Sequence, residues 1–298
     1  MTITILDGGM GRELDRSGAP FRQPEWSALA LMESPRHVTA AHETFARAGA
    51  KVITTNSYAV VPFHIGEDRF AADGARLARL SGELARDVAD RMNVRVAGSL
   101  PPVMGSYRPD LFSPETASPI LEVLIEALSP SVDIWLAETQ SSLAEARLVA
   151  ALLEPDPRPL WISFTLEDAD AKSVMAGEVP VQLRSGESVE AAAGLALELG
   201  VEALLFNCSQ PEVMEQAVRA AKSVAGMEAL SIGVYANAFA TEADDTEANE
   251  TLHDIRADLD PPTYCLWAKK WIDAGASIVG GCCGIAPEHI SVLANRLR

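Results

Sequence analysis

The chain has 298 residues, a length that fits one large α/β domain or two domains of ordinary size. Hydrophobic residues make up 48% of it and charged residues 22%, which is typical of a globular protein rather than a disordered or low-complexity one. The net charge is −18, from 24 Lys and Arg against 42 Asp and Glu. This charge argues against broad contact with nucleic-acid phosphates or anionic lipid, both of which need a basic surface.

Signals of membrane insertion and export are not evident in the sequence. No apolar run approaches the ~20 residues that span a bilayer. Residues 1–11 lack a basic region followed by a small-residue cleavage site. We therefore expect a cytoplasmic protein, a monomer or small homo-oligomer, that binds neither nucleic acid nor membrane.

Eight short apolar segments alternate with eight longer amphipathic segments. The expected strands are residues 3–6, 51–55, 94–98, 133–136, 160–165, 203–206, 230–234 and 277–279. The expected helices are residues 35–48, 72–91, 114–128, 142–153, 189–199, 211–221, 262–274 and 287–297. Several of these helices have Pro in the first turn, where its missing N–H costs nothing. No shift in composition divides the chain, so we treat residues 1–298 as one domain.

The pattern within the expected strands selects the fold class. They are apolar without alternation, which indicates burial on both faces, as in a parallel sheet. Eight βα units in 298 residues match a (β/α)₈ barrel in number and length. A doubly wound open sheet, the main alternative, more often has six or seven strands. We predict an α/β protein built as a single TIM-type barrel, with its site at the C-terminal ends of the strands.

Two expected connections at that end of the barrel are long. Residues 101–113 follow the third strand and are rich in Pro, Gly, Tyr and Arg. Residues 236–261 follow the seventh strand, and their 241–260 portion holds eight acidic residues against one Arg. We interpret this acidic segment as a solvated, mobile loop rather than a specific cation site.

Three of the four cysteines come directly after expected strands. Cys208 follows the sixth strand, and Cys282 and Cys283 follow the eighth. In a closed barrel these two strands flank the seventh, so the three thiols would converge at one rim. Three thiolates are a soft ligand set that selects zinc or copper(I), and they leave open the fourth tetrahedral position of a catalytic zinc. The alternative is that buried cysteines act as small hydrophobic residues, which we favour for Cys265 inside a helix.

Glycines around the paired cysteines support a shared metal. Adjacent residues of a regular strand point to opposite faces, so Cys282 and Cys283 can reach one ion only where the chain has left the strand. Gly280, Gly281 and Gly284 supply that conformational freedom.

The motifs of this chain resemble those of the zinc-dependent homocysteine S-methyltransferase family. They are Asp7-Gly8-Gly9-Met10-Gly11, Thr54-Thr55-Asn56-Ser57-Tyr58, Glu138-Thr139, Asn207-Cys208-Ser209 and Gly280-Gly281-Cys282-Cys283-Gly284. They span residues 7–284, and the Gly-Gly-Cys-Cys-Gly element with an upstream Asn-Cys is highly specific. The resemblance implies a (β/α)₈ barrel with one Zn²⁺ per chain, held by Cys208, Cys282 and Cys283. It also implies that the thiol of homocysteine is the fourth ligand and receives a methyl group, giving methionine; no catalytic residue beyond the zinc site is expected.

The amino-acid end of such a substrate needs its own partners. Asp7, Gly8, Gly9 and Met10 follow the first strand, in a turn whose backbone N–H groups can hold a carboxylate. The carboxylates of Asp7 and Glu138, the latter two residues past the fourth strand, can accept from an ammonium group. By resemblance, both contact the homocysteine amino group. The alternatives are a helix N-cap for Asp7 and an ordinary ion pair at the rim for Glu138.

Three further residues are expected near the mouth of the barrel. Asn56 and Tyr58 lie two residues apart after the second strand, and Tyr58 either faces a cationic methyl donor through its ring or packs as an ordinary aromatic. Asn237 follows the seventh strand. The five histidines show no metal-ligand spacing, and we expect surface or capping roles for them: His37, His42, His64, His253 and His289.

The sequence leaves the methyl donor and some alternatives open. Residues 98–110 lack the Gly-Pro-Tyr-Gly-like element that many family members carry after the third strand, so the donor is in doubt. In order of preference it is S-methylmethionine, S-adenosylmethionine or betaine. The acceptor is alternatively another thiol or a selenol. Other possibilities are a metal-free enzyme such as an aldolase, with Lys51 or Lys172 forming a Schiff base, and a non-catalytic zinc-binding or redox-sensing barrel.

Overall fold

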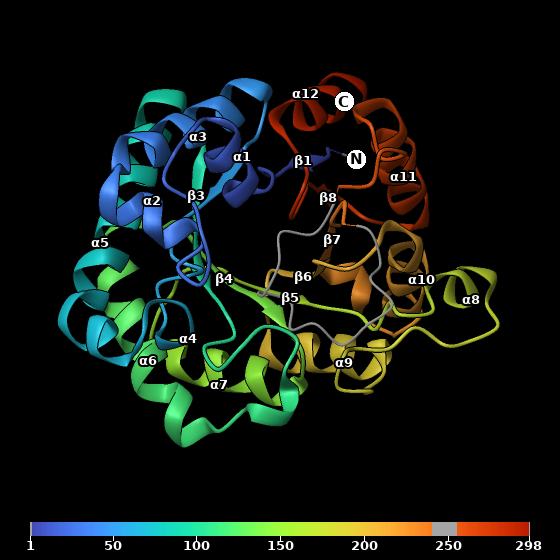
Figure 1. The fold of residues 1–298 in the computed structure, drawn as a ribbon. Coiled ribbons are helices and arrows are strands. Elements are labelled where there is room, and N and C mark those ends of the chain that lie inside the picture. The colour runs from blue at the N-terminus through green and yellow to red at the C-terminus, as the bar shows by residue number, and fades with distance from the viewer. Residues whose placement is uncertain (1, 240–254, 298) are drawn as a thin grey trace.

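The structure is a computed structural model that describes residues 2–239 and 255–297. Its eight strands form one parallel sheet in the order β1-β8-β7-β6-β5-β4-β3-β2. A parallel bridge between Leu6 and Val52 joins the two ends, so the sheet closes into a barrel inside a ring of helices (Figure 1). The strands are β1 (Thr4–Ile5), β2 (Val52–Thr54), β3 (Arg95–Leu100), β4 (Ile134–Gln140), β5 (Leu160–Phe164), β6 (Ala203–Asn207), β7 (Ser231–Tyr235) and β8 (Ile278–Val279). The predicted (β/α)₈ fold class is confirmed.

Helices follow the strands on the outside of the barrel. Within the described residues they are α1 (Met10–Arg16), α2 (Ser27–Glu33), α3 (Pro35–Ala48), α4 (Pro62–Ile65), α5 (Glu67–Met92), α6 (Pro114–Leu128), α7 (Leu143–Leu153), α8 (Ala171–Ala176), α9 (Val189–Leu199), α10 (Pro211–Lys222), α11 (Pro261–Ala274) and α12 (Pro287–Arg296). Proline occupies the first turn of α3, α6, α10, α11 and α12, as its fixed φ favours. No helix of the described part is long and apolar enough to cross a membrane.

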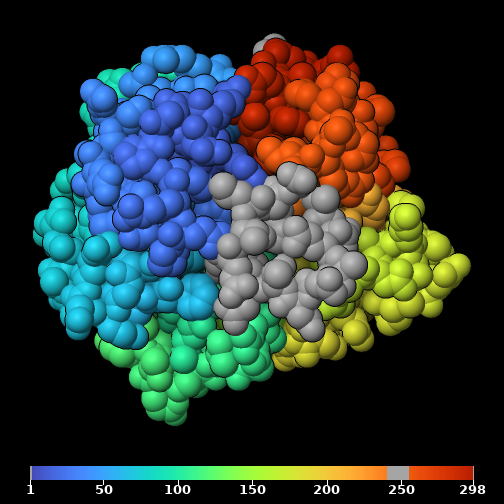
Figure 2. Space-filling view, viewed as in Figure 1, coloured from blue at the N-terminus to red at the C-terminus, as the bar shows by residue number. Residues whose placement is uncertain are grey.

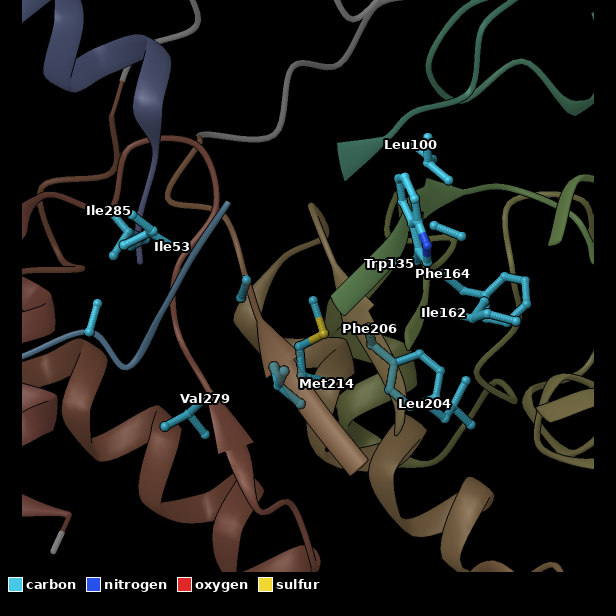
Figure 3. Close-up of a cluster of buried hydrophobic side chains, with 14 of the residues drawn as sticks. Ile53, Leu100, Trp135, Ile162, Phe164, Leu204, Phe206, Met214, Val279 and Ile285 are labelled. Carbon is cyan, nitrogen blue, oxygen red and sulfur yellow. The ribbon is translucent and has the colours of Figure 1, made fainter. Parts of the chain in front are cut away.

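Side chains of the strands divide between two apolar clusters, because successive residues of a strand point to opposite faces. One cluster contains a residue on or beside each of the eight strands and no helical residue, so it fills the barrel interior; Ile134, Leu136 and Leu205 belong to it. The other joins the outward-facing side chains to the helices, as with Phe206 of β6 and Met214 of α10 (Figure 3). Burial on both faces explains why the strand sequences show no alternation.

Strand and helix positions mostly agree with the predictions, and the corrections concern strand ends, short helices and two histidines. Strands β3 and β4 run beyond their predicted ends, to Leu100 and Gln140. The short helices α1, α2, α4 and α8 were not predicted. His42 and His64 are buried rather than surface residues, at 0% and 3% exposure. His42 lies on the inward face of α3 with Val38 and Phe45, and burial lowers its pKa to about 4, so its ring is neutral at pH 7.

A third long connection, residues 165–188, was also not predicted. It leaves the barrel after β5, carries α8, and returns through an antiparallel bridge between Leu166 and Leu183. The α8 part forms a lobe at the edge of the molecule, yellow-green in Figure 2. The base of this excursion reaches the mouth of the barrel. Most of the predicted acidic loop, residues 241–254, lies outside the described residues.

Candidate active site

Polar side chains continue the inward-facing rows of the barrel at the C-terminal ends of its strands. Glu138, for example, follows Ile134 and Leu136 on the same face of β4. The inward-facing polar positions are Thr54, Ser99, Glu138, Ser163, Asn207 and Tyr235. Three of them, Thr54, Glu138 and Tyr235, line a cavity of about 690 Å³ at this end of the barrel.

The cavity brings the predicted site residues together. All of the predicted metal and substrate residues line it: Asp7, Gly8, Gly9, Met10, Asn56, Tyr58, Glu138, Cys208, Asn237, Cys282 and Cys283. The two lysines considered as Schiff-base residues, Lys51 and Lys172, are exposed and do not line it. The cavity therefore offers thiols, carboxylates and amides, with no lysine amine among its described lining.

The cysteine cluster, which we define as Cys208, Cys282 and Cys283, lies against this cavity. The three sulfur atoms are all within 4.8 Å of one another. Cys208 and Cys282 are joined by a disulfide, whereas Cys283 is a free thiol with its Sγ 4.0 Å from that of Cys282. Cys265 is free and buried in α11, away from the cluster, as predicted. The disulfide thus joins Cys282 to Cys208 of the sixth strand's turn and not to its chain neighbour Cys283.

The cluster fits a metal site when the disulfide is reduced. Zinc binds thiolates at about 2.3 Å in a tetrahedron, which separates the sulfurs by about 3.8 Å. The Cys282–Cys283 separation of 4.0 Å is close to this value, and opening the disulfide frees Cys208 beside them. In the described residues these are the only three His, Cys, Asp or Glu side chains grouped closely enough to hold one ion.

Glycines allow the first and last turns of the barrel to meet at the cysteines. A Cβ added to Gly9 would lie 2.7 Å from the Cys282 carbonyl oxygen, and one added to Gly281 would lie 2.1 Å from Ile285. The Gly9 N–H donates to the Ile285 carbonyl at 2.9 Å, so it is not directed at a ligand in the cavity. This turn therefore packs closely against residues 282–285, and it also supplies the Asp7 carboxylate to the cavity.

Asp7 is a buried carboxylate rather than a helix cap. It is 7% exposed, and its Oδ2 and Oδ1 accept from the Thr54 backbone N–H at 2.7 Å and the Thr54 hydroxyl at 3.2 Å. The N-cap of α1 is Gly9 instead. Burial, together with the nearby Glu138 carboxylate, raises the Asp7 pKa to about 7, although the Thr54 hydrogen bonds act to lower it.

Glu138 lies within β4 and not two residues beyond it. The strand continues to Gln140 through an irregularity in its register after Ala137, and Glu138 lines the cavity. Its Oε1 accepts from the Ser99 hydroxyl, and burial raises its pKa to about 7. Two carboxylates that are costly to ionise thus face one cavity, where a cationic ligand would stabilise their charged forms.

Asn207 connects the carboxylate side of the site to the cysteines. Its Oδ1 accepts from the Thr139 backbone N–H at 3.1 Å and from the Ser163 hydroxyl at 2.7 Å, and its Nδ2 donates to the Thr139 hydroxyl at 2.9 Å. Thr139 follows Glu138 and has a φ of 63°, and Cys208 follows Asn207 and has a φ of 50°. A left-handed backbone conformation is costly for residues other than glycine, and the Asn207 bonds to Thr139 hold Thr139 in it.

The remaining predicted residues have mostly structural contacts at the cavity wall. The Asn56 amide donates to the Ser27 carbonyl at 3.1 Å, and the Asn237 side chain accepts from the Phe239 N–H at 3.3 Å. The Tyr58 hydroxyl is 2.6 Å from that of Ser106, and burial raises its pKa well above the usual range. The bond from Asn56 to Ser27 fixes α2 against the turn that follows β2.

Several cavity residues were not predicted. Tyr235 has a buried hydroxyl with no hydrogen-bond partner among the described residues. Tyr107 donates to the Cys208 carbonyl at 3.4 Å, and Asp168 and Arg184 come from the excursion after β5. Inward alternation along β7 would have identified Tyr235. Asp168 and Arg184 carried no signal, because their proximity depends on how the excursion folds.

Comparisons with known proteins agree with this geometry. A profile of the homocysteine S-methyltransferase family matches residues 4–297. Homocysteine S-methyltransferase 1 of Arabidopsis thaliana is 27% identical, covering 99% of this chain and 93% of its own length. Homocysteine S-methyltransferase of Escherichia coli is 30% identical, covering 99% and 95%. A selenocysteine methyltransferase of Astragalus bisulcatus is 27% identical, covering 96% and 90%.

Solved structures are similar over the same extent. The metallated form of the homocysteine methyltransferase MmuM from Escherichia coli superposes with a TM-score of 0.78 at 27% identity, covering 99% of this chain and 96% of that one. Its oxidised form gives the same TM-score, identity and coverage.

Proposed function

The chain belongs to the homocysteine S-methyltransferase family, and we propose that it is a zinc-dependent enzyme that transfers a methyl group from S-methylmethionine to the thiol of L-homocysteine. The observation that carries this proposal is the cysteine cluster facing the same cavity as two buried carboxylates. A thiol acceptor with an ammonium group needs both: a site for its sulfur and an anionic site for its head.

The cysteine cluster would hold the metal through Cys208, Cys282 and Cys283. A bound zinc ion would deprotonate a coordinating substrate thiol, which otherwise has a pKa near 8.5 and is mostly protonated at neutral pH. Burial raises the pKa of the free Cys283 thiol to about 11, so without a cation this cysteine stays neutral.

Asp7 and Glu138 would bind the ammonium group of the acceptor. Their raised pKa values mean that ionisation is unfavourable in the empty cavity, and an arriving ammonium would lower both. Thr54 and Ser99 fix the two carboxylates by hydrogen bonds, so the head group is held at a defined place relative to the thiol. The unpartnered Tyr235 hydroxyl is available to the same ligand.

The transfer itself asks for positioning rather than acid or base catalysis. When a methyl group leaves a sulfonium, the positive charge disappears and the leaving sulfide needs no proton. The described residues must therefore hold thiolate, methyl carbon and leaving sulfur in line and exclude water.

One assay tests this proposal. Reduced, zinc-loaded protein is incubated with homocysteine and, in turn, S-methylmethionine, S-adenosylmethionine and betaine, and methionine is measured by mass spectrometry. We expect the highest rate with S-methylmethionine, and the Cys265→Ala variant should match the wild type. No methionine from any donor would reject the proposed activity.

A selenol acceptor is a second candidate, supported by the similarity to a selenocysteine methyltransferase. A selenol is more acidic than a thiol and depends less on metal for its deprotonation. The same assay with selenocysteine decides between the acceptors, and we expect homocysteine to give the higher kcat/KM.

A further inference from the structure

An ion pair from the excursion after β5 lies in the wall of the same cavity, outside the machinery described so far. Arg184 Nη2 donates to Asp168 Oδ1 at 2.7 Å, and both side chains line the cavity. Their side chains are only 20% and 11% exposed, so this is a largely buried pair. Charged side chains are seldom buried without a binding or structural role.

The pair is fixed to the barrel. Asp168 Oδ2 accepts from the Gln210 backbone N–H at 2.8 Å, and the Gln210 side chain donates to the Asp168 carbonyl at 3.0 Å. The Arg184 guanidinium stacks on Tyr107, with its Cζ 4.3 Å from the ring centroid. Two charges of opposite sign are thus held rigidly against the cavity.

Arg184 has hydrogen-bonding capacity to spare. A guanidinium carries five N–H donors in a planar fork, and one of them bonds Asp168. Its Nε is buried and has no acceptor among residues 2–239 and 255–297. A buried donor without an acceptor is costly, and a carboxylate is the ligand that a guanidinium binds best.

Tyr107 connects this pair to the cysteine cluster, on the cavity that Asp7 and Glu138 also line. Cys283, Glu138 and Tyr107 all line this one cavity. Tyr107 lies between Arg184 and Cys208: its ring contacts the guanidinium, and its hydroxyl donates to the Cys208 carbonyl. A methyl transfer in line needs the donor on the side of the thiol away from the acceptor head group.

We infer that Arg184 and Asp168 are a second head-group site, which binds the carboxylate and the ammonium group of the methyl donor and so selects an amino-acid sulfonium. This inference rests on the proposed function. Betaine, which has a carboxylate but no ammonium N–H, would satisfy Arg184 and leave Asp168 without a ligand. Tyr58 and Tyr107 line the same cavity as the thiols, and their rings are suited to a sulfonium cation.

Substitutions separate this role from a purely structural one, in which the pair only anchors the excursion. Arg184→Gln and Asp168→Asn each remove one charge. The double variant removes both charges, so that no buried charge lacks a partner, and it should fold even if a single variant does not. Arg147→Gln is the matched control, because Arg147 forms a two-bond pair with Glu198 at 2.7 and 2.8 Å on the exposed surface and does not line the cavity.

The readouts are the two Michaelis constants and equilibrium binding. For Arg184→Gln and for the double variant, the KM for S-methylmethionine should rise about 10- to 100-fold, while the KM for homocysteine should change by less than about twofold. Asp168→Asn should weaken binding of S-methylmethionine by a similar factor. It should not change binding of dimethylsulfoniopropionate, which is a sulfonium carboxylate without an ammonium group. Arg147→Gln should match the wild type throughout.

Two kinetic results would contradict the inference. Equal rises in both KM values, or an unchanged donor KM, would assign the pair to anchoring the excursion and overturn the inference. Calorimetric titration of S-methylmethionine into the wild type and Arg184→Gln gives a test that does not need turnover. If the wild type transfers no methyl group, the proposed function is wrong. In that case the donor site is judged by calorimetry alone: it is wrong if the wild type does not bind S-methylmethionine, or if Arg184→Gln binds it as well as the wild type does.

Discussion

Replacing Asp7 by Asn should make the metal-free protein more stable at pH 8 while weakening its binding of homocysteine. Asn has nearly the same shape as Asp, and its oxygen can still accept from the Thr54 N–H that now donates to Oδ2 at 2.7 Å. The substitution therefore removes chiefly a charge. In the structure that charge is unfavourable, because burial raises the Asp7 pKa from 3.8 to about 7.

The sign and size follow from the raised pKa. Below about pH 4 the Asp7 carboxyl is protonated in both folded and unfolded protein, and the stability it contributes is fully present. As pH rises towards 7 the unfolded chain ionises first, and that stability is lost. A difference of about three pKa units corresponds to about 4 kcal/mol. Since water can enter the open cavity, we expect the Asn variant to be more stable by about 2–4 kcal/mol at pH 8 and by less than about 1 kcal/mol at pH 4.

Urea denaturation of both proteins at pH 4, 6 and 8, with reductant and chelator present, measures this difference. Asp273→Asn, at an exposed position of α11, is the control and should change stability by less than about 0.5 kcal/mol at every pH. A variant less stable than the wild type at pH 8 would mean that the Asp7 charge is already well solvated or paired, and Asp7 would then not be the ammonium site proposed here.

Three further predictions concern the other parts of the site. Replacing any residue of the cysteine cluster by Ala should remove most zinc, measured by elemental analysis, whereas Cys265→Ala should retain about one zinc per chain; full zinc in a cluster variant would refute the site. Glu138→Gln should lower kcat/KM for homocysteine by about 10- to 100-fold in a steady-state assay and leave zinc content unchanged; loss of zinc would give Glu138 a different role. Asn207→Ala should lower the free energy of unfolding by about 2–3 kcal/mol in urea, because it leaves Thr139 and Ser163 without buried partners, and an effect below 0.5 kcal/mol would contradict the network described.

The sequence was sufficient for the barrel and for the cysteine cluster. Eight apolar segments, each buried on both faces, define the strands, and glycines beside paired cysteines mark a turn that brings two neighbours to one side. These signals are local. They depend on spacing along the chain, and the order of the strands then follows from the closed parallel sheet.

Features set by tertiary contact were harder to predict. The end of β4 was missed because Glu138 and Gln140 have low strand propensity, yet Gln140 still pairs with Phe164 of β5 beyond an irregularity in register. His42 continues the apolar face of α3, and only its residue type suggested the surface. The Arg184–Asp168 pair depends on how residues 165–188 return to the barrel, and no periodicity encodes that path.

The most direct test of the central claim is the sulfur coordination of bound zinc, measured by zinc K-edge X-ray absorption before and after homocysteine is added to the reduced protein. We predict three sulfur neighbours near 2.3 Å in the free enzyme and four when homocysteine is present. An unchanged spectrum, or a first shell dominated by nitrogen or oxygen, would contradict it.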